Sequence, residues 1–207
     1  MDKNKKQIIW ISVAMVSVAT LIIVGYVYRD KIKSLAKKTF AGQNWFDESL
    51  KWWRDAKTKS IVETLHPKFR DKIAEFFARV EKELGLQMFA TSGYRDFQKQ
   101  AQLYAENSNN AKPGYSSHNY GFAVDVNVID PKTGNIILKK SNSSAEWEKS
   151  GIVKIARELG LKWGGGGAFG DYHDPIHFFI EPNGMKSSDM LALHNKGKVD
   201  NAGYVIV

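Results

Sequence analysis

Residues 116–129 read S-S-H-N-Y-G-F-A-V-D-V-N-V-I, and this stretch decides the fold of the chain. Its second part, Phe122–Ile129, alternates residue by residue, as expected of a β-strand with two different faces. Ala123, Asp125 and Asn127 share one of these faces, and the apolar side chains share the other. A carboxylate on such a strand is costly to bury unless another charge compensates it. The pattern therefore predicts a strand that carries a charged site.

The segments on either side of this strand predict a mixture of helices and short strands. Helical spacing of apolar residues and glycine stops indicate helices, and short β-rich runs indicate strands. The expected elements are a helix that follows Thr64–Pro67 and stops at Gly85, a strand at Leu86–Thr91, a helix at Phe97–Glu106, a strand at Ile136–Leu138, a helix at Trp147–Leu159 and a strand at Phe178–Glu181. This order predicts an α+β domain with a small, mostly antiparallel sheet and flanking helices.

A second short stretch, Asp174–Phe178, reads D-P-I-H-F and supplies another histidine and aspartate. A catalytic zinc site needs three protein ligands, an open position for water, and a base that accepts a proton. His118, Asp125 and His177 are candidate ligands, and Asp174 is left over as the base. Because the chain contains no cysteine, the ligands must be nitrogen and oxygen atoms.

Each of these residues, taken alone, has a simpler interpretation. His118 in a loop rich in serine and asparagine is compatible with an exposed histidine. Asp125 is compatible with a turn cap or with an ion pair to Arg95, and His177 with a histidine of the core. Only the joint spacing favours a metal site.

The motifs S-x-H-x-x-G-x-A-x-D and D-x-x-H are similar to those of a family of zinc peptidases. This family comprises D-Ala-D-Ala carboxypeptidases and L-alanyl-D-glutamate peptidases, including VanY-like enzymes and phage endolysins. The segment Ser92–Arg95, S-G-Y-R, followed by Gln100, also resembles the family pattern, as does the turn W-G-G at Trp163–Gly165. The resemblance covers about residues 62–181 and implies the fold of Hedgehog and DD-peptidase domains.

The resemblance implies one Zn²⁺ ion held by His118, Asp125 and His177, with Asp174 as general base. It also implies that Arg95 points into the site, where a guanidinium would stabilise oxyanion charge; a salt bridge elsewhere is the alternative. Four further residues are candidates for supporting the metal loop or lining the substrate groove: Ser116, Tyr120, Gln100 and His173. Tyr120 is also compatible with a packing role, and His173 with a competing ligand.

Two features depart from the family pattern. Glycines continue after the W-G-G turn to Gly167 and Ala168, where endopeptidases of the family often have a polar residue and a tryptophan. Pro175 directly follows Asp174, whereas relatives commonly have proline next to the histidine. The first departure concerns the specificity pocket. Beside the second, His173 is a competing candidate ligand, but the three-residue spacing from Asp174 favours His177.

The N-terminal part of the chain differs from the rest in charge and hydropathy. Residues 1–60 carry 12 Lys or Arg against 5 Asp or Glu, out of a net charge of +8 for the whole chain. Ile8–Tyr28 contains no charged residue and is long enough to cross a bilayer. This pattern predicts a membrane anchor in contact with lipid and disfavours nucleic-acid binding. The expected organisation is an N-terminal stub and anchor at 1–28, a basic aromatic stalk at 29–60, the peptidase domain at 61–181 and an extension at 182–207.

The predicted localisation is therefore a single-pass membrane protein whose catalytic domain faces the cell wall, or a protein of a phage virion. The basic residues after the anchor favour a cytoplasmic C-terminal side, which conflicts with a substrate in the wall.

The sequence favours hydrolysis of peptidoglycan stem peptides at the L-Ala–D-Glu bond. In this family an aspartate base and the W-G-G turn favour that activity, whereas carboxypeptidases more often have glutamate as the base. The alternatives are a D-Ala-D-Ala carboxypeptidase and a non-catalytic wall-binding or virion module with this fold. The oligomeric state is not indicated.

Overall fold

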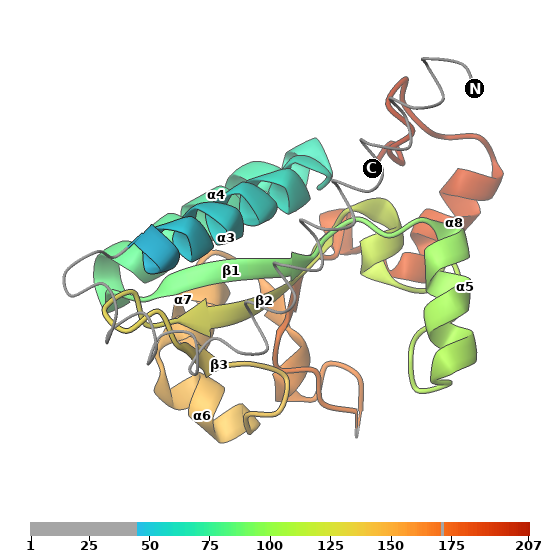
Figure 1. Ribbon diagram of the computed structural model, residues 1–207. Coiled ribbons are helices and arrows are strands. Elements are labelled where there is room, and N and C mark those ends of the chain that lie inside the picture. Colours follow the sequence, from blue (N-terminus) through green and yellow to red (C-terminus); the bar gives the residue numbers. More distant parts are fainter. Residues whose placement is uncertain (1–44, 171) are drawn as a thin grey trace, which may run out of the picture. The chain divides into compact units, whose positions relative to one another are not determined.

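A five-stranded antiparallel sheet lies at the centre of the chain's folded part (Figure 1). The computed structural model describes residues 45–170 and 172–207, of which Asp47–Val207 form one compact unit. The strand order is β1-β2-β5-β4, and β3 pairs with β2. The strands are β1 Gln87–Ser92, β2 Ala123–Ile129, β3 Ile136–Leu138, β4 Lys162–Trp163 and β5 His177–Phe179. The predicted α+β class with a small antiparallel sheet is confirmed.

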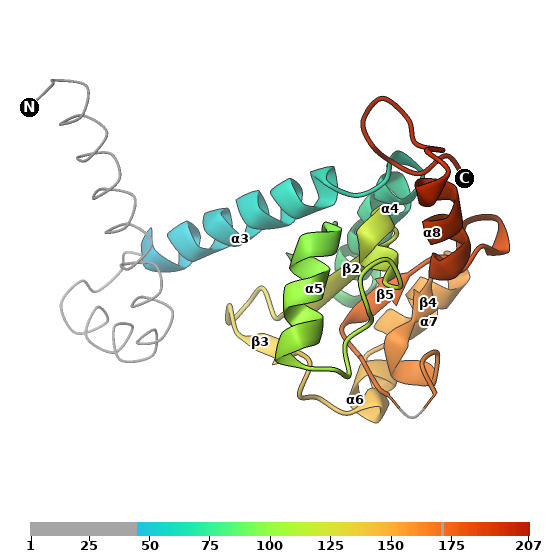
Figure 2. The same ribbon diagram turned by 90° about the vertical axis from the view of Figure 1, so that its right-hand side faces the viewer.

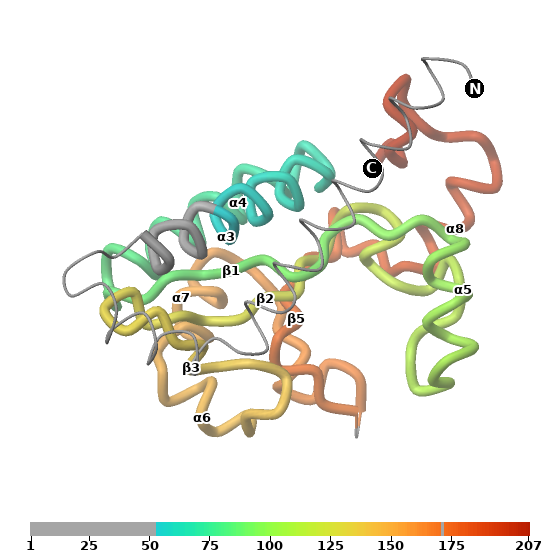
Figure 3. The backbone as a smooth tube through the Cα atoms, viewed as in Figure 1, coloured from blue at the N-terminus to red at the C-terminus, as the bar shows by residue number. Residues whose placement is uncertain are grey.

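Strand β2 organises the sheet because it pairs with three others. Strand β1 pairs along one edge of β2, and the backbone trace shows β1, β2 and β3 side by side (Figure 3). Strand β5 pairs with the first half of β2, so that Asp125 lies directly opposite His177. Directly opposed residues of antiparallel strands point to the same face. The register therefore places these two side chains together.

The apolar face of β2 packs against helices α4 (Pro67–Leu84), α6 (Ser144–Lys149) and α7 (Ile152–Glu158). Helix α4 begins at Pro67, where a missing backbone N–H costs nothing, and ends at Gly85 in a left-handed cap. Phe76 of α4 lies 5.0 Å from Phe178, measured between ring centroids. The core residues are fully buried, so the sheet is fixed from this side.

One long helix predicted at Trp147–Leu159 is in fact two short ones. Helix α6 ends at Lys149 and α7 starts at Ile152. Between them Gly151 adopts φ +85°, a left-handed conformation that cannot continue a right-handed helix. The turn allows both Trp147 and Ile152 to be buried in the same core.

Two further helices stand on either side of the segment that precedes β2 (Figure 2). They are α5 (Phe97–Glu106) and α8 (Ser187–Asn195). The segment between them contains the short 3-10 helix η1 (Ser117–Tyr120), which carries His118. The C-terminal extension is part of the core, because Met190 of α8 and Val205 are both buried.

Helix α3 (Trp45–Glu63) runs along β1, with Trp53 5.9 Å from Phe89 between ring centroids. A side-chain hydroxyl of this helix, Thr58 Oγ1, accepts a hydrogen bond from Ala90 N at 3.2 Å. The later part of the predicted stalk is thus helical and packs on the domain.

The predicted single-pass membrane localisation is corrected. Within residues 45–170 and 172–207, no helix combines the length and the apolar character needed to cross a bilayer. The two longest, α3 and α4, have 19 and 18 residues and carry charged side chains along their whole length. The predicted anchor, Ile8–Tyr28, lies outside the residues that the structure describes.

Candidate metal centre

His118 reaches the end of β2 because the chain turns sharply after η1. Gly121 makes that turn with φ +72°, and a Cβ atom there would lie 2.6 Å from the backbone nitrogen of His66. Only glycine fits both the conformation and the close approach. The backbone carbonyl of His118 accepts a hydrogen bond from Arg95 N at 3.0 Å. The glycine of the first motif therefore serves to bring His118 back over Asp125.

Three potential metal ligands converge at this point. His177 Nδ1 lies 2.9 Å from Asp125 Oδ1, and His118 Nε2 lies 3.1 Å from each of these atoms. His118 Nδ1 lies 2.5 Å from the carbonyl oxygen of Gly93. Because a carbonyl oxygen can only accept a hydrogen bond, the proton of the neutral ring is on Nδ1, and Nε2 has a free lone pair. That lone pair then faces a carboxylate oxygen. A cation relieves this repulsion, so the nitrogen and oxygen donors present fit a divalent metal.

Burial and charge act on the same three side chains. Burial lowers the pKa of His118 to about 4, so the ring is neutral at pH 7. Burial alone would raise the pKa of Asp125, but His118 and His177 outweigh it and hold that pKa well below its ordinary value. Neutral imidazoles and an ionised carboxylate are the forms that bind a metal.

Arg95 lies beside the cluster on the segment that joins β1 to α5. Its Nη2 is 3.4 Å from Asp125 Oδ2, and its Nη1 donates to Gln100 Oε1 at 3.2 Å. Gln100 is itself fixed by a hydrogen bond from its amide to Ala111 O at 2.7 Å. Among the described residues, Arg95 Nε is buried and has no hydrogen-bond partner. The guanidinium is thus held in place with its buried Nε–H unused.

Asp174 lies next to His177 and is largely buried. Its Oδ1 is 3.6 Å from Lys140 Nζ and has no hydrogen-bond partner in the described part of the chain. Burial and the charge of Asp125 raise the pKa of Asp174, while Lys140 opposes the rise. Lys140 also donates to Tyr172 OH at 3.2 Å. Asp174 is therefore a carboxylate with an unused acceptor and a raised pKa.

The W-G-G turn positions the loop that carries Asp174 and His177. The indole nitrogen of Trp163 donates to Pro175 O at 2.8 Å. A Cβ at Gly164 would lie 2.7 Å from Asp174 O, and one at Gly165 would lie 2.3 Å from the Trp163 ring. Two glycines are needed so that the loop can pass this close to β4.

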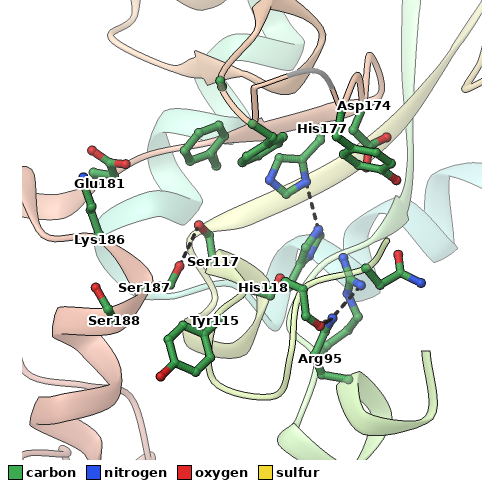
Figure 4. A pocket seen from close by; sticks show the side chains of 18 of the residues that line it. Arg95, Tyr115, Ser117, His118, Asp174, His177, Glu181, Lys186, Ser187 and Ser188 are labelled. Carbon is green, nitrogen blue, oxygen red and sulfur yellow. Dashed lines mark hydrogen bonds between the residues drawn. The ribbon is translucent and has the colours of Figure 1, made fainter. Parts of the chain in front are cut away.

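These side chains open into a cavity of about 540 Å³ (Figure 4). Figure 4 shows His118 and His177 near its middle, with Asp174 and Arg95 on one side and the first residues of α8 on the other. The remaining side chains that line it come from α5, from the segment that follows α5 up to η1, from residues 168, 169 and 172, and from β5 through the first residues of α8: Gln100, Asn109, Asn110, Ala111, Tyr115, Ser116, Ser117, Ala168, Phe169, Tyr172, Phe179, Glu181, Lys186, Ser187 and Ser188.

Of the four further candidates, two line the cavity and two do not. Ser116 and Gln100 line the cavity. Tyr120 is buried behind it, where its hydroxyl donates to Gly114 O at 2.8 Å. His173 is exposed and lies outside the ligand cluster.

Sequence reasoning missed Lys140 and Asn119, whose amide donates to Arg95 O at 2.8 Å. Asn119 directly follows a candidate ligand, which is a signal that could have found it. Lys140 lies in a loop with no distinguishing pattern.

Comparisons with known proteins match this architecture to one family. Residues 62–164 match the family model VanY, described as D-alanyl-D-alanine carboxypeptidase. The peptidoglycan L-alanyl-D-glutamate endopeptidase CwlK of Bacillus subtilis (strain 168) is 31% identical over 135 residues, which cover 59% of this chain and 77% of that protein. The chain belongs to the VanY family.

Two solved structures are also similar to this VanY-family chain. The L-Ala D-Glu endopeptidase ChiX of Serratia marcescens has 18% sequence identity and a TM-score of 0.45, and covers 63% of this chain and 91% of its own. A vancomycin resistance D,D-pentapeptidase VanY, solved as a mutant in complex with Zn(II), has 16% identity and a TM-score of 0.42. The match covers 62% of this chain and 78% of that one.

Proposed function

We propose that this VanY-family chain is a zinc-dependent peptidase that hydrolyses stem peptides of peptidoglycan, with the L-Ala–D-Glu bond as its preferred target. One observation carries the proposal. His118, Asp125 and His177 converge within hydrogen-bond distance, and the two histidines line a cavity that Asp174 and Arg95 also line. A domain that only binds the wall has no use for a buried carboxylate with a free acceptor beside a metal site.

His118, Asp125 and His177 are the residues that would hold the zinc ion. Two imidazoles and one carboxylate form a common set for catalytic zinc, and three protein ligands leave a coordination position open. Bound there, the ion supplies Lewis acidity and lowers the pKa of water. The Gly93 carbonyl orients His118 by accepting its Nδ1 proton at 2.5 Å, which directs Nε2 at the metal position.

Asp174 is the proposed general base. Its unpartnered Oδ1 can accept a proton from the attacking water, and its raised pKa makes it a better base than an ordinary aspartate. The same carboxyl group then carries the proton that the leaving amine needs. The charge of Lys140, at 3.6 Å, opposes the rise in the pKa of Asp174 and so favours its ionised form.

Arg95 is proposed to stabilise the negative charge that develops on the scissile carbonyl oxygen. Its Nη1 and Nη2 are held by Gln100 and Asp125, so the side chain does not need to reorganise. A donor fixed before the reaction is worth more than a mobile one. Its unused Nε–H faces no other described partner.

The bond preference rests on the aspartate base, on the W-G-G turn and on the activity printed for CwlK. The family model's description supports the second candidate, a D-Ala-D-Ala carboxypeptidase. Mass spectrometry of muropeptides digested by the full chain separates the two. Release of fragments that begin with D-Glu supports the endopeptidase, whereas loss of a terminal D-Ala with the L-Ala–D-Glu bond intact supports the carboxypeptidase.

The ligand assignment has its own test. His118→Ala is expected to abolish zinc binding and cleavage together, while His173→Ala removes a nearby exposed imidazole and should leave both intact. Undiminished cleavage by His118→Ala would contradict the assignment.

A further inference from the structure

Four side chains that line the cavity carry a formal charge at neutral pH: Arg95, Asp174, Glu181 and Lys186. The first three have partners. Arg95 pairs with Asp125 at 3.4 Å, Asp174 with Lys140 at 3.6 Å, and Glu181 with Lys162 at 2.5 Å. Of these four, Lys186 is the one for which the described part of the chain supplies no carboxylate within ion-pair distance.

Lys186 is held at the cavity by contacts of its neighbours. Its backbone N–H donates to Asp189 Oδ2 at 2.9 Å, which fixes the start of α8. The Ser187 and Ser117 hydroxyls are 3.4 Å apart, and Ser117 directly precedes the proposed ligand His118. Met190, one turn further along α8, is fully buried in the core. The position of Lys186 relative to the metal site is therefore set by the fold.

The charged side chains at the two ends of the cavity are held differently. Figure 4 shows Asp174 and Arg95 on one side and Glu181, Lys186, Ser187 and Ser188 on the other, with the two histidines between them. Glu181 is paired with Lys162, so within the described part of the chain Lys186 is the charge at that end without an ion-pair partner. A peptide whose scissile bond lies at the histidines would extend past the first residues of α8. An ammonium group and two hydroxyls at that point can all donate hydrogen bonds to an anion.

We propose that Lys186, with the Ser187 and Ser188 hydroxyls, binds a carboxylate of the substrate at the end of the cavity opposite Asp174 and Arg95. The proposal rests on the proposed function, since it names what the same cavity recognises. Stem peptides offer two such groups, the α-carboxylate of D-Glu and the C-terminal carboxylate. Lys186 is a specificity-determining residue and takes no part in bond cleavage.

The size of the effect follows from exposure. Lys186 is exposed in the free protein, so its charge is solvated before the substrate binds. A charge pair at such a position gains less than a buried one, and loss of the ammonium should weaken binding roughly 3- to 10-fold.

Binding is best measured without turnover. The zinc-loaded full chain carrying Asp174→Asn is titrated by calorimetry with the pentapeptide L-Ala–D-Glu–L-Lys–D-Ala–D-Ala. Two further peptides carry an amide at the D-Glu α-carboxyl or at the C-terminus. The same titrations are repeated with Lys186→Met added. Lys196→Met, which removes an exposed lysine outside the cavity, is the matched control.

One amidated peptide is expected to bind more weakly than the free pentapeptide, and the identity of that peptide names the carboxylate. Lys186→Met should remove the difference, and Lys196→Met should preserve it. The proposal is overturned if Lys186→Met binds the free pentapeptide as tightly as its parent, if amidation has no effect, or if no peptide binds. Cleavage assays of the unsubstituted chain test the proposed function separately. If a peptide binds through its carboxylate but is not cleaved, the proposed peptidase function is overturned and the role of Lys186 is not.

Discussion

Replacing Gly164 by alanine is expected to displace the loop that carries both the proposed base and the third metal ligand. The added methyl would lie 2.7 Å from Asp174 O, 2.9 Å from Phe169 Cε2 and 3.2 Å from His177 Cβ. The first and third contacts involve atoms that cannot move alone, so the Asp174–His177 segment must shift. Overpacking of this kind destabilises a protein by about 1–3 kcal/mol.

The functional effect should be larger than the loss of stability suggests. A shift of the base or ligand by a fraction of an ångström disturbs both proton transfer and coordination, and a misplacement of about 1 Å can reduce the rate by a factor of roughly 100. We expect Gly164→Ala to lose at least this factor in kcat/KM on a stem peptide and to bind zinc more weakly. Urea unfolding, zinc titration and a peptide cleavage assay measure the three quantities.

Gly160→Ala is the matched control. Gly160 adopts φ +69°, so alanine there is strained by about 1–2 kcal/mol. However, no atom lies within 4 Å of the added methyl, and Gly160 does not line the cavity. It should lose stability and keep kcat/KM. Equal losses of activity in the two variants, or full activity of Gly164→Ala, would refute the reasoning.

Three other predictions concern the site itself. Asp174→Asn should lower kcat by roughly 10²- to 10⁴-fold while one zinc ion stays bound; loss of the zinc, measured by metal analysis, would instead make Asp174 a ligand. Arg95→Lys keeps the charge but removes the fixed fork, and should lower kcat roughly 100-fold with little change in zinc content; wild-type kcat would argue against a role in oxyanion stabilisation. The zinc-free protein should lose stability as pH falls from 6.5 towards 4. Folding lowers the pKa of His118 from 6.5 to about 4, so between these pH values His118 binds a proton in the unfolded chain but not in the folded one. The depressed pKa of Asp125 adds a loss of the same sign at lower pH. Urea unfolding in chelator across this range checks the sign, and a flat profile contradicts it.

The fold class could be predicted because local patterns determine it. The alternation in β2 and the helical spacing in α4 lead to one core, in which the valines of β2 face Phe76 and its neighbours. The break between α6 and α7 could not be predicted from apolar spacing, since it depends on the left-handed conformation of Gly151. The membrane localisation rested on the hydropathy and charge of the N-terminal residues, and no described helix supports it.

The candidate ligands were found in the sequence because each lies in a short local motif. The contact between them could not be predicted in this way, because it joins residues far apart in the chain. Asp125 and His177 are 52 residues apart and meet only because β2 and β5 pair in one register. Lys140 and Lys186 lie in segments without a motif, and their places beside the cavity come from loop packing. Charges that act across a cavity leave little trace in a single sequence.

We predict that His118, Asp125 and His177 hold one zinc ion on which peptide cleavage depends. The most direct test is to titrate zinc into the metal-free full chain and follow muropeptide cleavage by mass spectrometry. Cleavage should be absent at the start, rise with added zinc and saturate at one equivalent per chain, and His118→Ala should stay inactive throughout. Full cleavage by the metal-free protein would contradict the account.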